Sequence, residues 1–212
     1  MDKERVALNH MIKRREKISE NDHLVICISR TQGSAGNDIG FGLADKLRIN
    51  YYDVEIFDQV LRRLEAEKGA VNDAEYFADF NKYEKKHKFD PKAVFFNMSD
   101  LICDLASKED CIIMGRCADA ILKNNHIPHI SLFITAPFAI RVQHVMDVRK
   151  MNMKQAVRFL KKMDSQHRRY YNFYGGAQWG KPDNYDLCIN SASYGINETE
   201  NLILKLLNDQ IH

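Results

Sequence analysis

The chain alternates between short apolar runs and longer segments in which apolar residues recur every three or four positions. Short apolar runs are typical of buried strands, and the longer spacing is typical of helices that pack on a sheet. The strands predicted in this way cover residues 25–30, 49–52, 111–114, 130–134 and 185–189. The last three runs are continuously apolar, so we expect both faces of these strands to be buried.

Helices are predicted between these strands. Apolar residues four positions apart predict a helix that ends near Arg48, and Pro91 begins a second amphipathic helix. Further helical segments are expected at 55–68 and in a polar, charged insertion at about 70–90. Because helices alternate with strands, we predict an α/β fold of three layers, with a mostly parallel five-stranded sheet flanked by helices. Ligands should then bind at the carboxyl ends of the strands.

The first 22 residues differ from the rest of the chain. Helix-forming residues at 3–18 precede a polar break, which predicts an accessory N-terminal helix (1–22) ahead of a single domain (23–212). The 212 residues are 45% hydrophobic and 28% charged, which suits one substantial core.

Charge and cysteine content narrow the function classes. A net charge of +2 is too small to attract nucleic acid in bulk, so a small anion is the expected partner. None of the five cysteines forms a C-x-x-C pair, which favours free thiols in a reducing compartment. Neither a signal peptide nor a membrane-spanning segment is recognisable, so we expect a cytoplasmic protein without a membrane partner.

The segment after the first strand carries the strongest chemical signal. Gly33 and Gly36 lie between that strand and the next helix, where backbone N–H groups can converge on an anion at the positive end of the helix. Against the pattern G-x-x-x-x-G-K-[ST], Thr31 occupies the first glycine position. Asn37 replaces the lysine and Asp38 replaces the hydroxyl residue that binds magnesium.

Further polar motifs follow the other predicted strands. The second strand leads to Asp53 and the third to Gly115 and Arg116. The fourth leads to Thr135-Ala136-Pro137 and the fifth to Asn190-Ser191-Ala192. Because the carboxyl ends of parallel strands share one edge of a sheet, these groups are expected to line one crevice.

With these motifs in place, the chain resembles the cytidylate kinase-like family, relatives of bacterial cytidylate kinase within the P-loop nucleoside monophosphate kinases. The resemblance runs from about residue 24 to the C-terminus. Its motifs are Ile28-Ser29-Arg30 with Gly33-Ser34-Ala35-Gly36, Leu43-Ala44-Asp45-Lys46-Leu47 before Tyr51-Tyr52-Asp53, Met114-Gly115-Arg116, Thr135-Ala136-Pro137 with Arg141, Asp164 before Arg168-Arg169-Tyr170-Tyr171, Trp179-Gly180, and Tyr185-Asp186-Leu187 before Asn190-Ser191.

The resemblance implies a P-loop kinase fold with a helical lid, and transfer of the γ-phosphoryl group of ATP, with Mg²⁺, to a small acceptor such as CMP. The implied nucleotide- and phosphate-binding residues are Arg30, Gly33, Ser34, Ala35, Gly36, Asn37 and Asp38, with Asp38 also the candidate magnesium ligand. The implied catalytic residues are Arg116, Asp164, Arg168 and Arg169. The implied acceptor-binding residues are Asp53, Arg116, Asp119 and Arg141.

The basic segment 149–174 is interpreted as the lid, because its cations would close over the phosphates once the glycine loop has bound them. A run of charges is otherwise typical of a solvated helix face.

Three departures from the family pattern leave other functions open. No basic residue occupies the lysine position, Cys117 stands where an aspartate is expected after Gly-Arg, and His167 stands where a lid arginine is expected. The alternatives are a weakly active or inactive nucleotide-binding sensor and a kinase for a different small phosphate acceptor.

Overall fold

The computed structural model describes residues 22–53 and 91–211. Its centre is a sheet of five parallel strands in the order β2-β3-β1-β4-β5. The strands are β1 (Val25–Arg30), β2 (Asn50–Tyr52), β3 (Cys111–Met114), β4 (Ile130–Thr135) and β5 (Leu187–Asn190). The predicted α/β class, with a parallel five-stranded sheet, is therefore confirmed.

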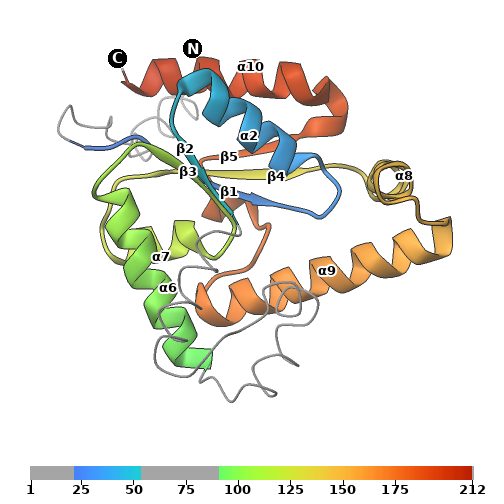
Figure 1. Cartoon of the computed structure of the whole chain (residues 1–212), viewed down its shortest axis with the longest axis horizontal. Helices are drawn as coiled ribbons and strands as arrows, with labels where there is room; N and C mark the ends of the chain where they lie inside the picture. The colour runs from blue at the N-terminus through green and yellow to red at the C-terminus, as the bar shows by residue number, and fades with distance from the viewer. Residues whose placement is uncertain (1–21, 54–90, 212) are drawn as a thin grey trace, which may run out of the picture.

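Helices cover both faces of this sheet (Figure 1). The helices α2 (Gly36–Leu47) and α10 (Ser191–Ile211) lie on one face, and α6 (Pro91–Ala106), α7 (Ala118–Asn124) and α9 (Met153–Tyr174) lie on the other. The helix α8 (Phe138–Arg149) lies beyond the carboxyl end of β4, and a short 3-10 helix, η1 (Pro182–Asn184), precedes β5. Pro91 begins α6 as predicted, whereas the pattern analysis did not delimit α7, α8 or α10.

Alternation of side chains along the strands divides the core into two clusters. Ile26 and Ile28 of β1 pack with residues of α2 and α10, while Val25 and Cys27 pack with residues of α6 and α7. This period of two is what a strand between two helical layers requires. A third, smaller cluster joins α8 to α9.

The expectation that β5 is buried on both faces is wrong. Ile189 is buried, but Cys188 is exposed. The reason is the strand order, which makes β5 an edge strand beside β4 alone. Continuous apolarity did not distinguish this edge strand from the central strands β1 and β4.

Several sequence expectations lie outside the described residues. These are the accessory helix in residues 1–22, apart from Asp22 itself, the helix at 55–68 and the insertion at about 70–90. Within the described part of the chain, no helix is both long and apolar enough to cross a membrane.

Candidate phosphate-binding and acceptor site

The loop that joins β1 to α2, residues 31–36, is called the glycine loop here. Two of its residues have left-handed backbone angles. Gly33 has a φ of 82°, and Ala35, the N-cap of α2, has a φ of 59°. The Ser34 hydroxyl lies 2.8 Å from the carbonyl oxygen of Thr31 and 3.2 Å from that of Ile134. The Ser191 hydroxyl in turn donates to the Ser34 carbonyl at 2.7 Å. Contacts from β4 and α10 therefore hold the middle of the loop in place.

This loop presents a row of backbone donors at the start of α2. Within the described parts of the chain, no acceptor is found for the N–H groups of Gly33, Ala35, Gly36, Asn37 and Asp38. The first N–H groups of a helix lack partners inside the helix, and the helix dipole makes this end attractive to anions. These N–H groups are available to an anion, and the anion cradle stays a prediction.

Asn37, at the lysine position of the P-loop pattern, is held between two charged side chains. Its Oδ1 accepts a hydrogen bond from Arg30 Nε at 2.8 Å, and its Nδ2 donates to Asp53 Oδ2 at 2.6 Å. Gly36 leaves room for this arrangement, because a Cβ there would lie 2.6 Å from Arg30 Cβ. Arg30, the last residue of β1, thus brings a cation into contact with the residue at the lysine position.

The turn that joins β3 to α7 brings a second guanidinium to the same place. Gly115, Arg116 and Cys117 have φ values of 64°, 58° and 57°, and a left-handed conformation is costly for the two that are not glycine. Arg116 Nη2 lies 3.9 Å from Asp53 Oδ1, and Arg30 Nη2 lies 3.8 Å from Asp53 Oδ2. Arg30, Asn37, Asp53 and Arg116 form what we call the strand-end cluster.

Burial and like charge shape the electrostatics of this cluster. The pKa of Arg30 is lowered, mainly by burial and also by Arg116, while Asp53 acts in the opposite direction. His167 on α9 has its pKa lowered to about 3, first by burial and then by Arg30 and Arg116. Within the described residues, the buried Nδ1 atom of His167 has no hydrogen-bond partner. A neutral imidazole therefore lies beside two guanidinium groups.

Arg141 and Asp164 lie at the glycine loop and pair with each other. Arg141 Nη1 donates to Asp164 Oδ2 at 2.7 Å and to the carbonyl oxygen of Gln32 at 3.0 Å. Asp164 Oδ1 accepts from the Gln32 N–H at 3.0 Å. The family resemblance predicts Arg141 at the acceptor and Asp164 among the catalytic groups, whereas in the structure both contact the glycine loop and each other.

The other basic candidates on α9 are not brought to the cluster in the same way. Arg168 and Arg169 are exposed, and the Arg168 guanidinium lies 5.9 Å from the centre of the Trp179 ring. The Asp38 carboxylate is also exposed, and within the described part of the chain it forms neither a hydrogen bond nor an ion pair. In this part of the chain no group of three or more metal-ligating side chains occurs.

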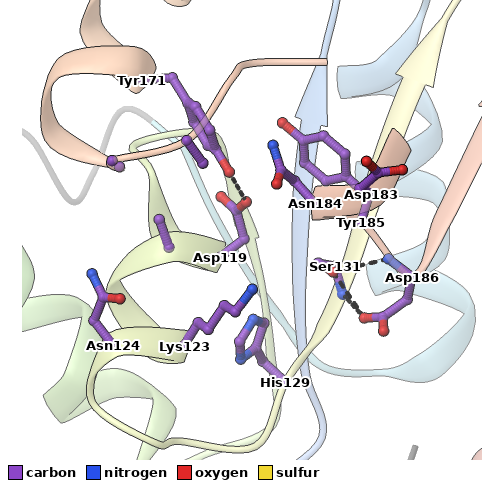
Figure 2. Close-up of a pocket in the computed structure, with 14 residues that line it drawn as sticks. Asp119, Lys123, Asn124, His129, Ser131, Tyr171, Asp183, Asn184, Tyr185 and Asp186 are labelled. Atoms are coloured by element: carbon purple, nitrogen blue, oxygen red, sulfur yellow. Dashed lines mark hydrogen bonds between the residues drawn. The ribbon is translucent and has the colours of Figure 1, made fainter. Parts of the chain in front are cut away.

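Asp119 faces a different part of the molecule. Its carboxylate accepts a hydrogen bond of 2.5 Å from the Tyr171 hydroxyl, and burial raises its pKa. Both residues line a cavity of about 420 Å³ on the α7 and α9 side of the sheet (Figure 2). The described residues that line this cavity also include Lys123, His129 and Asp186, but none from the glycine loop or the strand-end cluster. A role for Asp119 in binding the acceptor stays a prediction.

The structure brings the predicted residues Arg30, Arg116 and Asp53 together, and their roles stay predictions. The contacts of Asn37, His167 and Gln32 were not predicted from the sequence. His167 had a signal, since it interrupts a basic stretch at a position where an arginine was expected. No sequence signal could have identified Gln32, because its contacts are made by its backbone.

The chain belongs to the cytidylate kinase-like family, whose model matches residues 25–193. Among solved structures it is similar to an uncharacterized protein from Eubacterium ventriosum, with a TM-score of 0.69, 26% identity, and coverage of 88% of this chain and 99% of that one.

Two shikimate kinases share the fold. The enzyme from Bacteroides thetaiotaomicron has a TM-score of 0.53 at 12% identity, covering 87% of this chain and 98% of its own. The enzyme from Aquifex aeolicus has a TM-score of 0.50 at 20% identity, covering 87% and 96%. A search of curated protein sequences gave no match.

Proposed function

We propose that this protein is a phosphotransferase that binds ATP at the glycine loop and transfers the γ-phosphoryl group to a small acceptor such as CMP. The observation that carries the proposal is the row of N–H groups at the start of α2, with Arg30 and Arg116 at the ends of two neighbouring strands. Phosphoryl transfer needs positioning and cations more than covalent chemistry, and these groups can supply both.

Each part of the site has a distinct task in this proposal. The loop N–H groups hold the donor phosphates, and Arg30 supplies the positive charge that the lysine position lacks. Arg116 binds the acceptor's phosphate through its guanidinium fork, and Asp53 orients that guanidinium from the other side.

Mg²⁺ fits this site only through the nucleotide. The ion commonly uses one or two carboxylates together with phosphate oxygens, and the exposed Asp38 carboxylate at the first turn of α2 can be one of them. When bound, the ion neutralises charge on the phosphates.

A second function is favoured by two specific observations. Asn37 is neutral and His167 is neutral, so two positions where cations are expected carry no charge. A protein that binds triphosphate without transferring it would tolerate both. A kinase for a different acceptor is the third candidate, because a guanidinium that binds phosphate does not distinguish CMP from another small phosphate acceptor.

Measured turnover separates these functions. Purified protein with ATP and Mg²⁺ is screened for ADP release with each nucleoside monophosphate, while calorimetry measures ATP binding separately. Acceptor-dependent ADP release with CMP supports the proposal, and release with another acceptor supports the third candidate. Binding without turnover supports the sensor, and a lack of ATP binding rejects the nucleotide site. The same assay is run on Arg116→Ala, which removes the proposed acceptor-binding guanidinium. Lys205→Ala, an exposed change on α10, is its control.

A further inference from the structure

We infer that Arg141 and Asp164 are positioning residues that hold the glycine loop in its anion-binding shape and tie that shape to α9. This inference rests on the proposed triphosphate site. Together with the backbone of Gln32 we call the pair the loop clamp.

The clamp joins three segments that are far apart in the sequence. Asp164 on α9 accepts the Gln32 N–H at 3.0 Å, and Arg141 on α8 donates to the Gln32 carbonyl at 3.0 Å. The two side chains meet at 2.7 Å. Arg141 Nε also donates to the carbonyl oxygen of Ala136, which follows β4, at 3.1 Å. Both backbone polar groups of Gln32 are therefore held by side chains from the two helices.

Burial makes stability a poor explanation for this pair. Its side chains are only 9% and 15% exposed. Removing two charges from water is costly, and well-packed apolar residues often serve stability as well as a buried ion pair does. Buried ion pairs can instead fix one specific conformation. Here the pair fixes the backbone conformation of the glycine loop at Gln32.

The residue after Gln32 shows why that arrangement matters. Gly33 has a φ of 82°, and a Cβ there would lie 3.1 Å from Val145 Cγ2 and 3.2 Å from the Arg141 carbonyl. The loop thus passes close to α8 directly after the clamp. Because the clamp fixes the peptide groups on either side of Gln32, it also sets the direction in which the following N–H groups point. Donors held in place before the ligand arrives bind it more tightly than donors that must first be ordered.

Because of the charges in the clamp, removing Arg141 alone and removing both partners should weaken ATP binding to different extents. The Asp164 carboxylate lies at a loop that receives phosphates, and it is neutralised there by Arg141. Removing Arg141 alone leaves a carboxylate facing the triphosphate, whereas removing both charges leaves none. Replacing Arg141 should therefore weaken ATP binding more than replacing both residues does.

The clamp also links the two sides of the proposed site. Asp164 lies one helical turn before His167, which is close enough to Arg30 and Arg116 to feel their charges. A shift of α9 would consequently move the loop and the surroundings of the strand-end cluster together.

The test is a double-mutant cycle read by calorimetric ATP titration with Mg²⁺. Arg141→Met should weaken binding by about 100-fold and Asp164→Asn by about 10-fold, and the double variant should bind more tightly than Arg141→Met. Lys205→Met, an exposed change on α10, should bind as the wild type does. Melting curves identify variants that are unfolded at the titration temperature, and these are remeasured at a lower one. Equal ATP affinity in all folded variants, or a double variant as weak as Arg141→Met, overturns the inference.

Hydrogen exchange at the Gln32 amide provides a readout that needs no nucleotide. Asp164→Asn should speed exchange there, because the charged acceptor of this N–H is lost, while Lys205→Met should not. Unchanged exchange overturns the clamp even if ATP binds. If wild-type protein binds no ATP, the proposed function fails, and faster exchange then still supports a clamp that shapes the loop.

Discussion

The glycine loop after β1 and the turn after β3 both present hydrogen-bond donors at the carboxyl edge of the sheet, but the donor groups differ. Both follow buried, neighbouring parallel strands, both contain left-handed residues, and both open a helix. The loop presents backbone N–H groups, whereas the turn presents the guanidinium of Arg116. A backbone donor survives most substitutions that preserve the shape, but a side-chain donor is lost with its residue. Mutations should therefore act through charge at the turn and through shape at the loop.

Arg116→Ala should give the largest loss. If Arg116 holds the acceptor's phosphate in the transition state, its removal costs about 2–4 kcal/mol, or about two to three decades in kcat/KM. The measurement is steady-state kinetics with varied acceptor, with Lys205→Ala as the control. Full activity in folded Arg116→Ala would mean that the guanidinium only supports the turn.

Gly36→Ala tests the loop through its shape. The new Cβ would lie 2.6 Å from Arg30 Cβ, so Arg30 must move away from Asn37 and Asp53. We expect a loss of about 1–3 kcal/mol in the free energy of unfolding, with weaker ATP binding. Ala35→Gly is the matched control, because it removes a left-handed alanine and should be neutral or stabilising. Normal ATP affinity and stability in Gly36→Ala would contradict the assigned packing.

Asn37→Lys adds a side-chain cation to the loop. An ammonium near the β- and γ-phosphates should strengthen ATP binding by about 1–3 kcal/mol, an effect that Arg30 next to it would reduce.

Asp38→Ala, titrated with ATP in the presence and absence of magnesium, tests whether the Asp38 carboxylate binds the ion. If it does, the magnesium dependence of ATP binding disappears in Asp38→Ala; if dependence is unchanged, Asp38 is not a ligand.

Closure of the segment 149–174 is a smaller effect. In this structure α9 is held by several contacts. Among them, Leu160 packs against α8, Asp164 joins the clamp, and Tyr171 bonds to Asp119. The lid prediction requires hydrogen exchange in this segment to slow when ATP binds, because phosphate contacts favour the closed state. Unchanged exchange despite calorimetrically confirmed binding would assign α9 to the rigid frame.

The effect of His167 should be on stability rather than on activity, and it should be visible in the pH dependence of unfolding. Its pKa is lowered to about 3 in the folded protein, against an ordinary value of 6.5. The unfolded chain therefore binds more protons between these values, so this contribution is present above pH 6.5 and is lost as the pH falls towards 3. Unfolding at pH 7 and pH 4.5 should show a smaller loss of stability in His167→Gln than in wild type. His126→Gln, an exposed control, should behave like wild type.

The sequence by itself determined the local elements of this protein. Strand, glycine turn and helix follow from the spacing of apolar residues and from two glycines, and these features need no distant partner. The same holds for Arg116, because a charged residue directly after a buried strand is expected at the carboxyl edge of the sheet. The family model matches residues 25–193, a range that contains these motifs.

Only the tertiary structure decided which of these elements meet. The strand order places β3 between β1 and β2, so Arg30, Arg116 and Asp53 converge, and it leaves Cys188 on an exposed edge. The rotation and packing of α8 and α9 direct Arg141 and Asp164 to the loop backbone. Sequence spacing fixes neighbours within one element, but contacts between elements depend on strand order and helix packing, which the whole core sets at once.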